Sequence, residues 1–434
     1  MKTMASVKAV FLKRIGKNEA KSAIDRLLSA PILRNKLVFW ILAFIFAWWL
    51  FLQSYAFFLE WDTDSPSYYT AAHGLLAKIN IYEDAEFQVL GNALFGRGLI
   101  IYPYIYPPLL AQLLLPLAGL PLSTFVLIFN VFNFALIFLG LFLIARVLEF
   151  DLGRSILPPL FLFLLLPFNE PLQTTLHHGQ VNLLVLDIIL LSLIFQKKEK
   201  PVPAALFLSL AVFIKIYPVL FILPFIFSKK IRYLTAFAAS SAALLAASVL
   251  VSGTKPWLDF ARSTLDLFLK RPDSPFTRGF QDSFGNVSLK SFLSQLFAAL
   301  RLPPSLVIPV FISLAVLFLF LMFGSPWKRA IASDLALEGS LLLILTLVLA
   351  PITWSHHFVL ILFPAAYLFN RILAEKRYAA FFLLAFLISQ IFYNLPWGAF
   401  PFNQVRLAAS LGFLAMLFYF AATSPRTVRA SASA

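Results

Sequence analysis

The sequence predicts an all-α, polytopic membrane protein. Of its 434 residues 61% are hydrophobic and only 13% are charged, whereas a soluble domain is about 45–50% apolar. The apolar excess recurs along nearly the whole chain in runs of roughly 15–25 residues, and about 20 such residues cross the hydrocarbon core as a helix. Basic residues gather in the terminal segments and in many of the short polar loops. Together these observations indicate a bundle of membrane helices rather than one anchor on a soluble body.

About twelve runs are long and apolar enough to be counted as spans. The predicted runs are 37–59, 106–120, 122–147, 156–168, 181–195, 203–227, 233–252, 306–323, 335–350, 354–369, 379–394 and 405–422.

The charges predict the orientation and the division of the chain. Residues 1–36 contain nine basic and two acidic residues, and the positive-inside rule places such a segment in the cytoplasm. We expect a transmembrane domain at 37–423, a cytoplasmic tail at 424–434, and outer loops at about 60–105 and 253–303.

The middle of the chain departs from this rule. A strict count places the basic segment 196–200 outside and the polar segment 169–180 inside. The conflict disappears if 106–120 is re-entrant and the polar break at 215–218 divides its run into two half-helices. We favour this second topology.

Several classes of function are excluded or unsupported. The chain has no cysteine, which excludes disulfides and thiolate metal sites. It has no HExxH, P-loop, GxGxxG or GxSxG motif, so neither a metal nor a nucleotide cofactor is expected. We assign much of the net charge of +15 to loops and tails facing anionic membrane lipids, not nucleic acid.

In the first outer segment, two carboxylates separated by one residue, Asp62 and Asp64, are followed by the pair Tyr68 and Tyr69. Acidic side chains at a membrane exit are solvated, whereas inside the bilayer they cost several kcal/mol, on the order of 3. They are therefore available for acid–base chemistry. The alternative is an ordinary hydrated loop beside the membrane.

A lysine interrupts the apolar run 203–227. Pro218 breaks the helix there, and we expect Lys215 to face a polar cavity or an anion unless it reaches back to the membrane surface. The polar stretch His177–His178–Gly179–Gln180–Val181–Asn182 precedes an apolar run and is either a helix cap with solvated side chains or the polar floor of a sugar or phosphate site.

Further cationic groups follow on the predicted outer face. His356 and His357 point about 100° apart on a helix, so one of them contacting a phosphate is favoured over a shared metal. The second outer loop contains Arg262, Arg271 and Arg278, and arginine is well suited to phosphate. Long loops also escape the charge bias, which leaves a simple solvated loop as the alternative.

Taken in order, these stretches resemble glycosyltransferase family 87, the polyprenyl-phosphate-sugar-dependent enzymes of the GT-C superfamily. The matching motifs are Asp64-x-x-x-Tyr68-Tyr69-x-Ala71-Ala72, Tyr106-Pro107-Pro108-Leu109, Gly179-Gln180-Val181-Asn182, Lys215-x-Tyr217-Pro218, Asn286-x-Ser288-Leu289 and Trp354-Ser355-His356-His357. The chain departs from the family pattern at Ser65–Pro66 and in the loop sequence QDSFGNVSL.

The resemblance implies a GT-C helical bundle and an inverting transfer with Asp64 as the single general base. The donor is a polyprenyl-phosphate sugar, with mannose favoured, and the acceptor is a lipid- or glycan-linked hydroxyl on the outer face of the plasma membrane. The residues assigned to the donor phosphate or sugar are Lys215, Tyr217, His356, His357, Arg262, Arg271, Arg278, Gln180 and Asn182, with Asp62, Tyr68, Tyr69, Tyr106 and Asn286 nearby.

Three alternatives stay open. One is an arabinofuranosyl donor within the same family. Another is a flippase for lipid-linked sugars or a secondary transporter, supported by Lys215 and by the intramembrane Asp187, which is either an ion-pair partner of Lys215 or a buried structural carboxylate. The third is a non-catalytic assembly subunit, to which an intact Asp64 gives little support.

Overall fold

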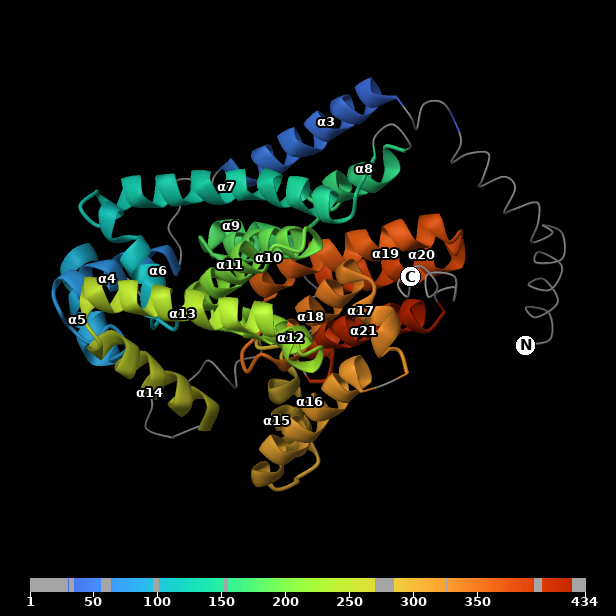
Figure 1. Ribbon diagram of the computed structural model, residues 1–434. Coiled ribbons are helices and arrows are strands. Elements are labelled where there is room, and N and C mark those ends of the chain that lie inside the picture. The colour runs from blue at the N-terminus through green and yellow to red at the C-terminus, as the bar shows by residue number, and fades with distance from the viewer. Residues whose placement is uncertain are drawn as a thin grey trace.

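The computed structural model describes residues 30, 35–55, 64–96, 101–151, 155–269, 285–324, 326–393 and 400–423. All regular secondary structure in these ranges is helical, with no strand (Figure 1).

The first half of the fold contains long helices alternating with short, broken ones. Its elements are α3 (Lys36–Ser54), α4 (Asp64–Leu76), α5 (Asp84–Phe95), α6 (Pro108–Leu113), η3 (Leu115–Leu117), α7 (Leu122–Val147), α8 (Leu157–Leu164), α9 (Glu170–His177), α10 (Asn182–Lys197), α11 (Pro201–Ile214), η4 (Tyr217–Ile222), α12 (Leu223–Phe227) and α13 (Ile231–Ser252).

The second half has the same character. Its elements are α14 (Lys255–Leu269), α15 (Leu289–Ala299), η5 (Pro304–Leu306), α16 (Val307–Phe323), α17 (Lys328–Ala332), α18 (Leu335–Leu349), η6 (Ser355–Ile361), α19 (Leu362–Ala374), α20 (Tyr378–Phe392), η7 (Phe402–Gln404) and α21 (Val405–Thr423).

Six helical segments in the described part of the chain are long and apolar enough to cross a membrane, and a bent pair, α9 with α10, gives up to seven. The six are Lys36–Ser54, Leu122–Val147, Ile231–Ser252, Pro304–Phe323, Ser355–Ala374 and Phe402–Thr423. The protein is therefore an integral membrane protein.

The expected count of about twelve spans is not confirmed, because several of the apolar runs fold into shorter pieces. The run 156–168 contains only the eight-residue helix α8. The segment 106–120 forms the six-residue helix α6 and one 3₁₀ turn, too short to cross a bilayer as a helix. Helix α18 has 15 residues, and most of them are buried inside the protein.

The break predicted within the run 203–227 is confirmed. Helix α11 ends at Ile214, Lys215 has extended backbone angles (φ −150°, ψ 125°), and η4 begins at Tyr217. The cause is Pro218, which has no N–H for the carbonyl of Ile214 and whose ring would clash with that carbonyl in a continuous helix. The break turns Lys215 out of the helix.

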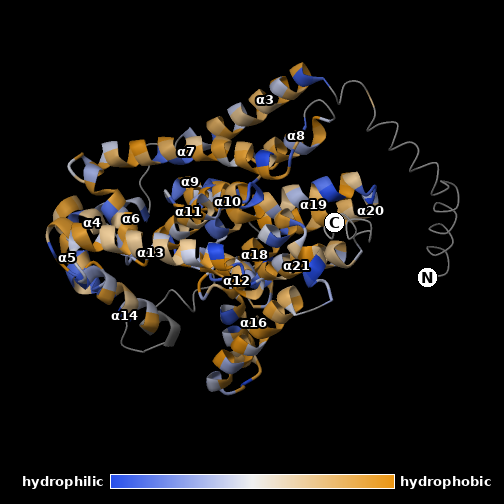
Figure 2. Ribbon diagram, in the orientation of Figure 1, coloured by the Kyte–Doolittle hydropathy of each residue, from blue (hydrophilic) through white to orange (hydrophobic). Residues whose placement is uncertain are grey.

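The core and the lipid-facing surface are clearly separated. Helices α10 and α18 lie inside the bundle, whereas only 6% of the apolar window of α13 is buried. Figure 2 shows that α7, α13 and α16 are largely hydrophobic along their lengths. Helices α4, α5 and α6 gather at one end of the bundle (Figure 1).

Candidate active site

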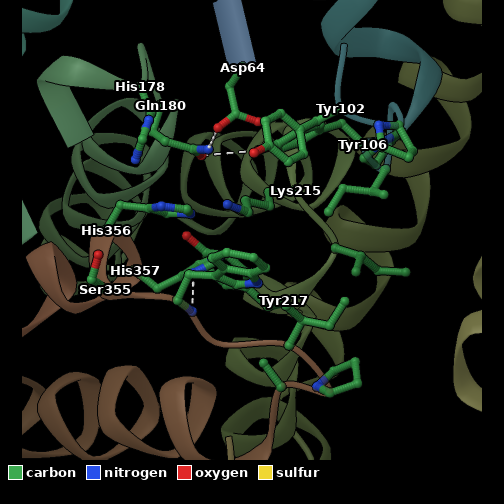
Figure 3. Close-up of a pocket in the computed structure, with 18 residues that line it drawn as sticks. Asp64, Tyr102, Tyr106, His178, Gln180, Lys215, Tyr217, Ser355, His356 and His357 are labelled. Atoms are coloured by element: carbon green, nitrogen blue, oxygen red, sulfur yellow. Dashed lines mark hydrogen bonds between the residues drawn. The ribbon is translucent and has the colours of Figure 1, made fainter. Parts of the chain in front are cut away.

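Five breaks between helices meet around one cavity of about 210 Å³. The residues lining it come from the start of α4, the segment before α6, the α9–α10 turn, the α11–η4 break and the α18–η6 connection. They are Asp64, Tyr102, Pro103, Ile105, Tyr106, Pro107, His178, Gln180, Lys215, Ile216, Tyr217, Ala350, Pro351, Ile352, Trp354, Ser355, His356 and His357. Figure 3 shows the carboxylate of Asp64, the Lys215 ammonium and the His356 ring directed toward the same space.

The Asp64 carboxylate is held by an amide. Asp64 is the first residue of α4, where the positive end of the helix dipole stabilises a negative charge. The Nε2 of Gln180 donates a hydrogen bond to Asp64 Oδ2. The Tyr106 hydroxyl donates to Gln180 Oε1 over 3.0 Å, which turns the amide N–H groups toward the carboxylate. The chain Tyr106–Gln180–Asp64 therefore fixes the orientation of the acid (Figure 3).

A glycine makes this contact possible. Gly179 has φ +61°, and a Cβ built on it would lie 2.0 Å from the Ser65 Oγ. Only a residue without a side chain fits this approach. Ser65, which departs from the family pattern, is 2% exposed and packs directly against this turn. A small residue after Asp64 therefore suits the close approach of the turn that contains Gln180.

Two buried phenols lie behind the carboxylate. The rings of Tyr68 and Tyr106 meet edge to face, with centroids 5.1 Å apart. Burial, followed by the negative charge of Asp64, raises the pKa of Tyr106. Burial, followed by Tyr106 and then Asp64, raises the pKa of Tyr68. Both phenols therefore stay protonated at neutral pH, and Tyr106 remains a hydrogen-bond donor.

The Lys215 ammonium lies among polar and aromatic groups and is 8% exposed. Its Nζ donates to Asn182 Oδ1 over 2.7 Å. The same Nζ is 5.2 Å from the Tyr106 ring centroid and 5.5 Å from the Tyr217 ring centroid, within the range of cation–π attraction. An ammonium has three donors, and the side chain faces the cavity, so Lys215 is positioned to bind an anion.

The α18–η6 connection places two imidazoles beside this lysine. The carbonyl of His356 accepts hydrogen bonds from Asn182 Nδ2 (3.1 Å) and from Thr175 Oγ1 (3.0 Å). His357 Nδ1 accepts from the Trp354 N–H over 3.0 Å. A neutral His357 must then have its proton on Nε2. The rings of His356 and His357 are 4.5 Å apart, and His178 meets His356 at 6.0 Å.

The cavity is polar on one side and apolar on another. One carboxylate, one ammonium and three imidazoles line it together with Ile105, Ile216 and Ile352. Ile105 and Ile216 are 37% and 45% exposed, so their side chains also reach the outer surface. This combination suits a ligand with an anionic head and an apolar body.

The predicted site residues differ in how they lie relative to the cavity. Asp64, Tyr106, Gln180, Lys215, Tyr217, His356 and His357 line the cavity. Asn182 lies behind it and bonds to Lys215. Asp62, Arg271 and Arg278 lie outside the described residues.

Three further predicted residues lie away from the cavity. The Tyr69 hydroxyl donates to the Leu120 carbonyl over 2.8 Å. Arg262 is exposed on α14. Asn286 braces the cavity wall instead: its Oδ1 accepts from the Thr353 N–H (3.0 Å) and its Nδ2 donates to the Pro351 carbonyl (3.3 Å).

Asp187 is not the ion-pair partner of Lys215, whose hydrogen-bond acceptor is Asn182. Asp187 is 1% exposed and faces Gly140, where an added Cβ would lie 2.7 Å from its Oδ1.

The cavity also contains residues that the sequence did not single out. Tyr102, Ile105, Ile216 and Ile352 had no signal, because apolar and aromatic residues are common throughout this chain. His178 and Trp354 belong to polar motifs, and those motifs were the available signal. In the described ranges no group of three or more histidine, aspartate or glutamate residues is arranged to hold a metal ion.

The chain is similar in sequence to a known mannosyltransferase. The chain is 24% identical over 327 residues to the polyprenol-phosphate-mannose-dependent alpha-(1-2)-phosphatidylinositol mannoside mannosyltransferase of Mycolicibacterium smegmatis, which covers 67% of this chain and 68% of the relative. No solved structure matches the chain.

The sequence profile of glycosyltransferase family 87 matches residues 104–351, more than half of the 434 residues. The match includes Tyr106, Gln180 and Lys215. The two histidines of η6 lie just beyond its C-terminal end, whereas Asp64 lies well before its start. This match covers more than half of the chain and most of the segments that form the cavity. The chain therefore belongs to glycosyltransferase family 87.

Proposed function

We propose that the protein transfers a mannosyl residue from a polyprenyl-phosphate donor to a hydroxyl group of a glycolipid or glycan. The observation that supports this proposal best is the sharing of one cavity by the Asp64 carboxylate and the Lys215 ammonium. The donor class and the sugar follow the relative from Mycolicibacterium smegmatis.

The chemistry requires one base. Asp64 takes the proton of the acceptor hydroxyl while that oxygen attacks the anomeric carbon. The bond between the anomeric carbon and the phosphate oxygen breaks, and polyprenyl phosphate leaves as an anion. No general acid is needed for such a leaving group, and a single displacement inverts the anomeric centre, unlike the paired carboxylates of retaining glycosidases.

The cationic side of the cavity receives the phosphate. The Lys215 ammonium and the Nε2–H of His357 stabilise the charge that grows on the leaving oxygen. The apolar surface at Ile105 and Ile216 faces the first isoprene units. Asn182 keeps Lys215 and the His356 carbonyl together.

The proposal is tested with purified protein in lipid nanodiscs, radiolabelled polyprenyl-phosphate mannose and a membrane glycolipid extract. We expect labelled glycolipid with inverted anomeric configuration and free polyprenyl phosphate. Use of an arabinofuranosyl donor in preference to the mannosyl donor would mean that the transferred sugar is arabinofuranose and not mannose. Movement of the donor across the vesicle membrane without formation of a glycosidic bond would mean that the protein is a transporter and not a glycosyltransferase.

The donor site is tested at Lys215. Charge-assisted hydrogen bonds contribute about 1.5–3 kcal/mol, which corresponds to about 10- to 150-fold at ~1.4 kcal/mol per decade. We expect Lys215→Met to lower kcat/KM for the donor by this factor without changing the unfolding temperature in detergent by more than a few degrees. Lys198→Met is the control, because that side chain is exposed and lies outside the cavity. Normal donor kinetics in Lys215→Met would mean that this lysine does not bind the phosphate.

We further propose that both termini are cytoplasmic and that the cavity opens on the outer face, as the loop charges indicate. The chain has no cysteine, so single cysteines can report the sidedness. Ala85→Cys and Ala332→Cys are a matched pair, since both alanines are exposed on helices. In intact cells an impermeant thiol reagent should label the first and spare the second. The opposite pattern would reverse the orientation.

A further inference from the structure

Helix α14 presents an apolar strip that the described part of the chain leaves exposed. Leu258 and Leu265 are 57% and 52% exposed, and Ala261 between them is also exposed. Their spacing of three and four residues places them on one face of the helix. Two exposed leucines on a short amphipathic helix are therefore presented to the surroundings in a fixed direction.

One side of α14 is packed against the protein, which fixes the direction of the strip. Phe260 is 8% exposed, and its ring lies 5.7 Å from that of Tyr82. The Trp257 ring lies 5.2 Å from that of Phe213. The helix cannot roll to bury Leu258 without breaking these contacts.

The start of α14 lies at the end of a membrane helix. Helix α13 is a candidate span, and only 6% of its apolar window is buried. It ends at Ser252, and α14 begins at Lys255 after a turn at Gly253 (φ +78°). The Trp257 Nε1 donates to Ser248 Oγ over 2.7 Å, one turn inside the end of α13. Trp is enriched at this level of a bilayer. Figure 1 shows α14 diverging from α13 and from the bundle.

Two exposed basic residues flank the strip. Arg262 and Lys255 are exposed and lie next to the strip on the helix surface. Asp259 is 9% exposed and paired with Lys255 over 2.8 Å. An apolar strip flanked by basic residues is the pattern of helices that lie in the plane of a membrane interface.

We infer that α14 is an interfacial helix whose strip of Leu258, Ala261 and Leu265 enters the boundary between headgroups and acyl chains, with Arg262 on anionic headgroups. This inference does not rest on the proposed sugar transfer. It gives Arg262 a partner other than the donor phosphate, in agreement with its position outside the cavity.

The test uses single cysteines at Leu258, Leu265 and Ser263, each labelled with a small fluorophore, in nanodiscs containing lipids with a quencher on the acyl chain. Ser263 is the control, because it lies on the same helix turned away from the strip and is only partly exposed. We expect quenching at 258 and 265 to exceed that at 263 at least about threefold. Equal quenching at all three positions would overturn the proposal. So would a blue-shifted but unquenched label at 258, which would indicate a protein cover such as a second copy.

The headgroup part is tested separately with the label at 258. Quencher attached to anionic lipid should act at least about twofold more strongly than quencher on zwitterionic lipid, and Arg262→Gln should abolish the difference, because each basic residue attracts anionic lipid. No preference in the otherwise unchanged protein would remove anionic lipid as the partner of Arg262.

Discussion

Replacing Asp64 by asparagine is expected to lower turnover at least about a hundredfold while donor binding persists, because a positioned general base contributes typically 10²–10⁴-fold. Asparagine keeps the shape of the side chain, and its amide oxygen can still accept the hydrogen bond from Gln180. The substitution therefore removes the proposed base without removing the contact that orients this side chain. The measurement is single-turnover transfer of labelled sugar, with donor affinity determined in parallel.

Asp84 provides the matched control for this substitution. Like Asp64 it is the first residue of a helix in the first outer segment, at the start of α5, but it does not line the cavity. Asp84→Asn should stay within about twofold of wild-type turnover, because Asp84 does not line the cavity. Asp62→Asn should stay within about tenfold, because the sequence predicts Asp62 to be a solvated neighbour, and solvated charges interact weakly through water. Full activity in Asp64→Asn would contradict the one-base mechanism. A large loss only in Asp62→Asn would move the base to that residue.

The second large effect is expected at Gly179. In Gly179→Ala the new Cβ would meet Ser65 Oγ at 2.0 Å, so either this buried hydroxyl rotates away or the turn containing Gln180 shifts relative to Asp64. A misplacement of about 1 Å near the chemistry can cost on the order of a hundredfold. We expect kcat/KM to fall between about ten- and a hundredfold, with a lowered unfolding temperature from the positive φ.

Two further variants isolate the steric cause. Gly96 also has a positive φ (+83°), but nothing lies within 4 Å of an added Cβ. Gly96→Ala should therefore lose stability and keep its activity within about threefold. Combining Gly179→Ala with Ser65→Gly removes the obstacle, and part of the activity should return. An inactive double variant with unchanged fold would mean that the contact with Ser65 is not the cause.

The sequence predicted individual residues of the site better than the contacts between them. Lys215 stands out because a charge beside a proline in an apolar run has a local physical cost, and the break it marks is present. The contact between Gln180 and Asp64 joins residues 116 positions apart. It depends on a positive φ at Gly179 and on the small size of Ser65, neither of which has a signature in the apolar periodicity.

The span count shows the opposite error. Apolar length alone cannot distinguish a helix that crosses lipid from a short helix surrounded by protein, and α18 is of the second kind, with 15 mostly buried residues. The segment 106–120 was predicted to be re-entrant because the charge pattern needed it; its helices are too short to cross a bilayer, and its re-entrance stays a prediction. Loop charges thus corrected the apolar pattern where both were present.

The five breaks that form the cavity also set the order in which it can arise. A membrane protein is inserted from its N-terminus during synthesis, so Asp64 leaves the ribosome long before Lys215 and longer still before His356. No nascent chain that ends before His357 contains both the Asp64 carboxylate and all the residues proposed to bind the donor phosphate. The newly inserted first helices therefore contain the Asp64 carboxylate before Lys215 and the histidines of η6 are present. The proposed sugar transfer can begin only when the end of α18 has docked at the cavity.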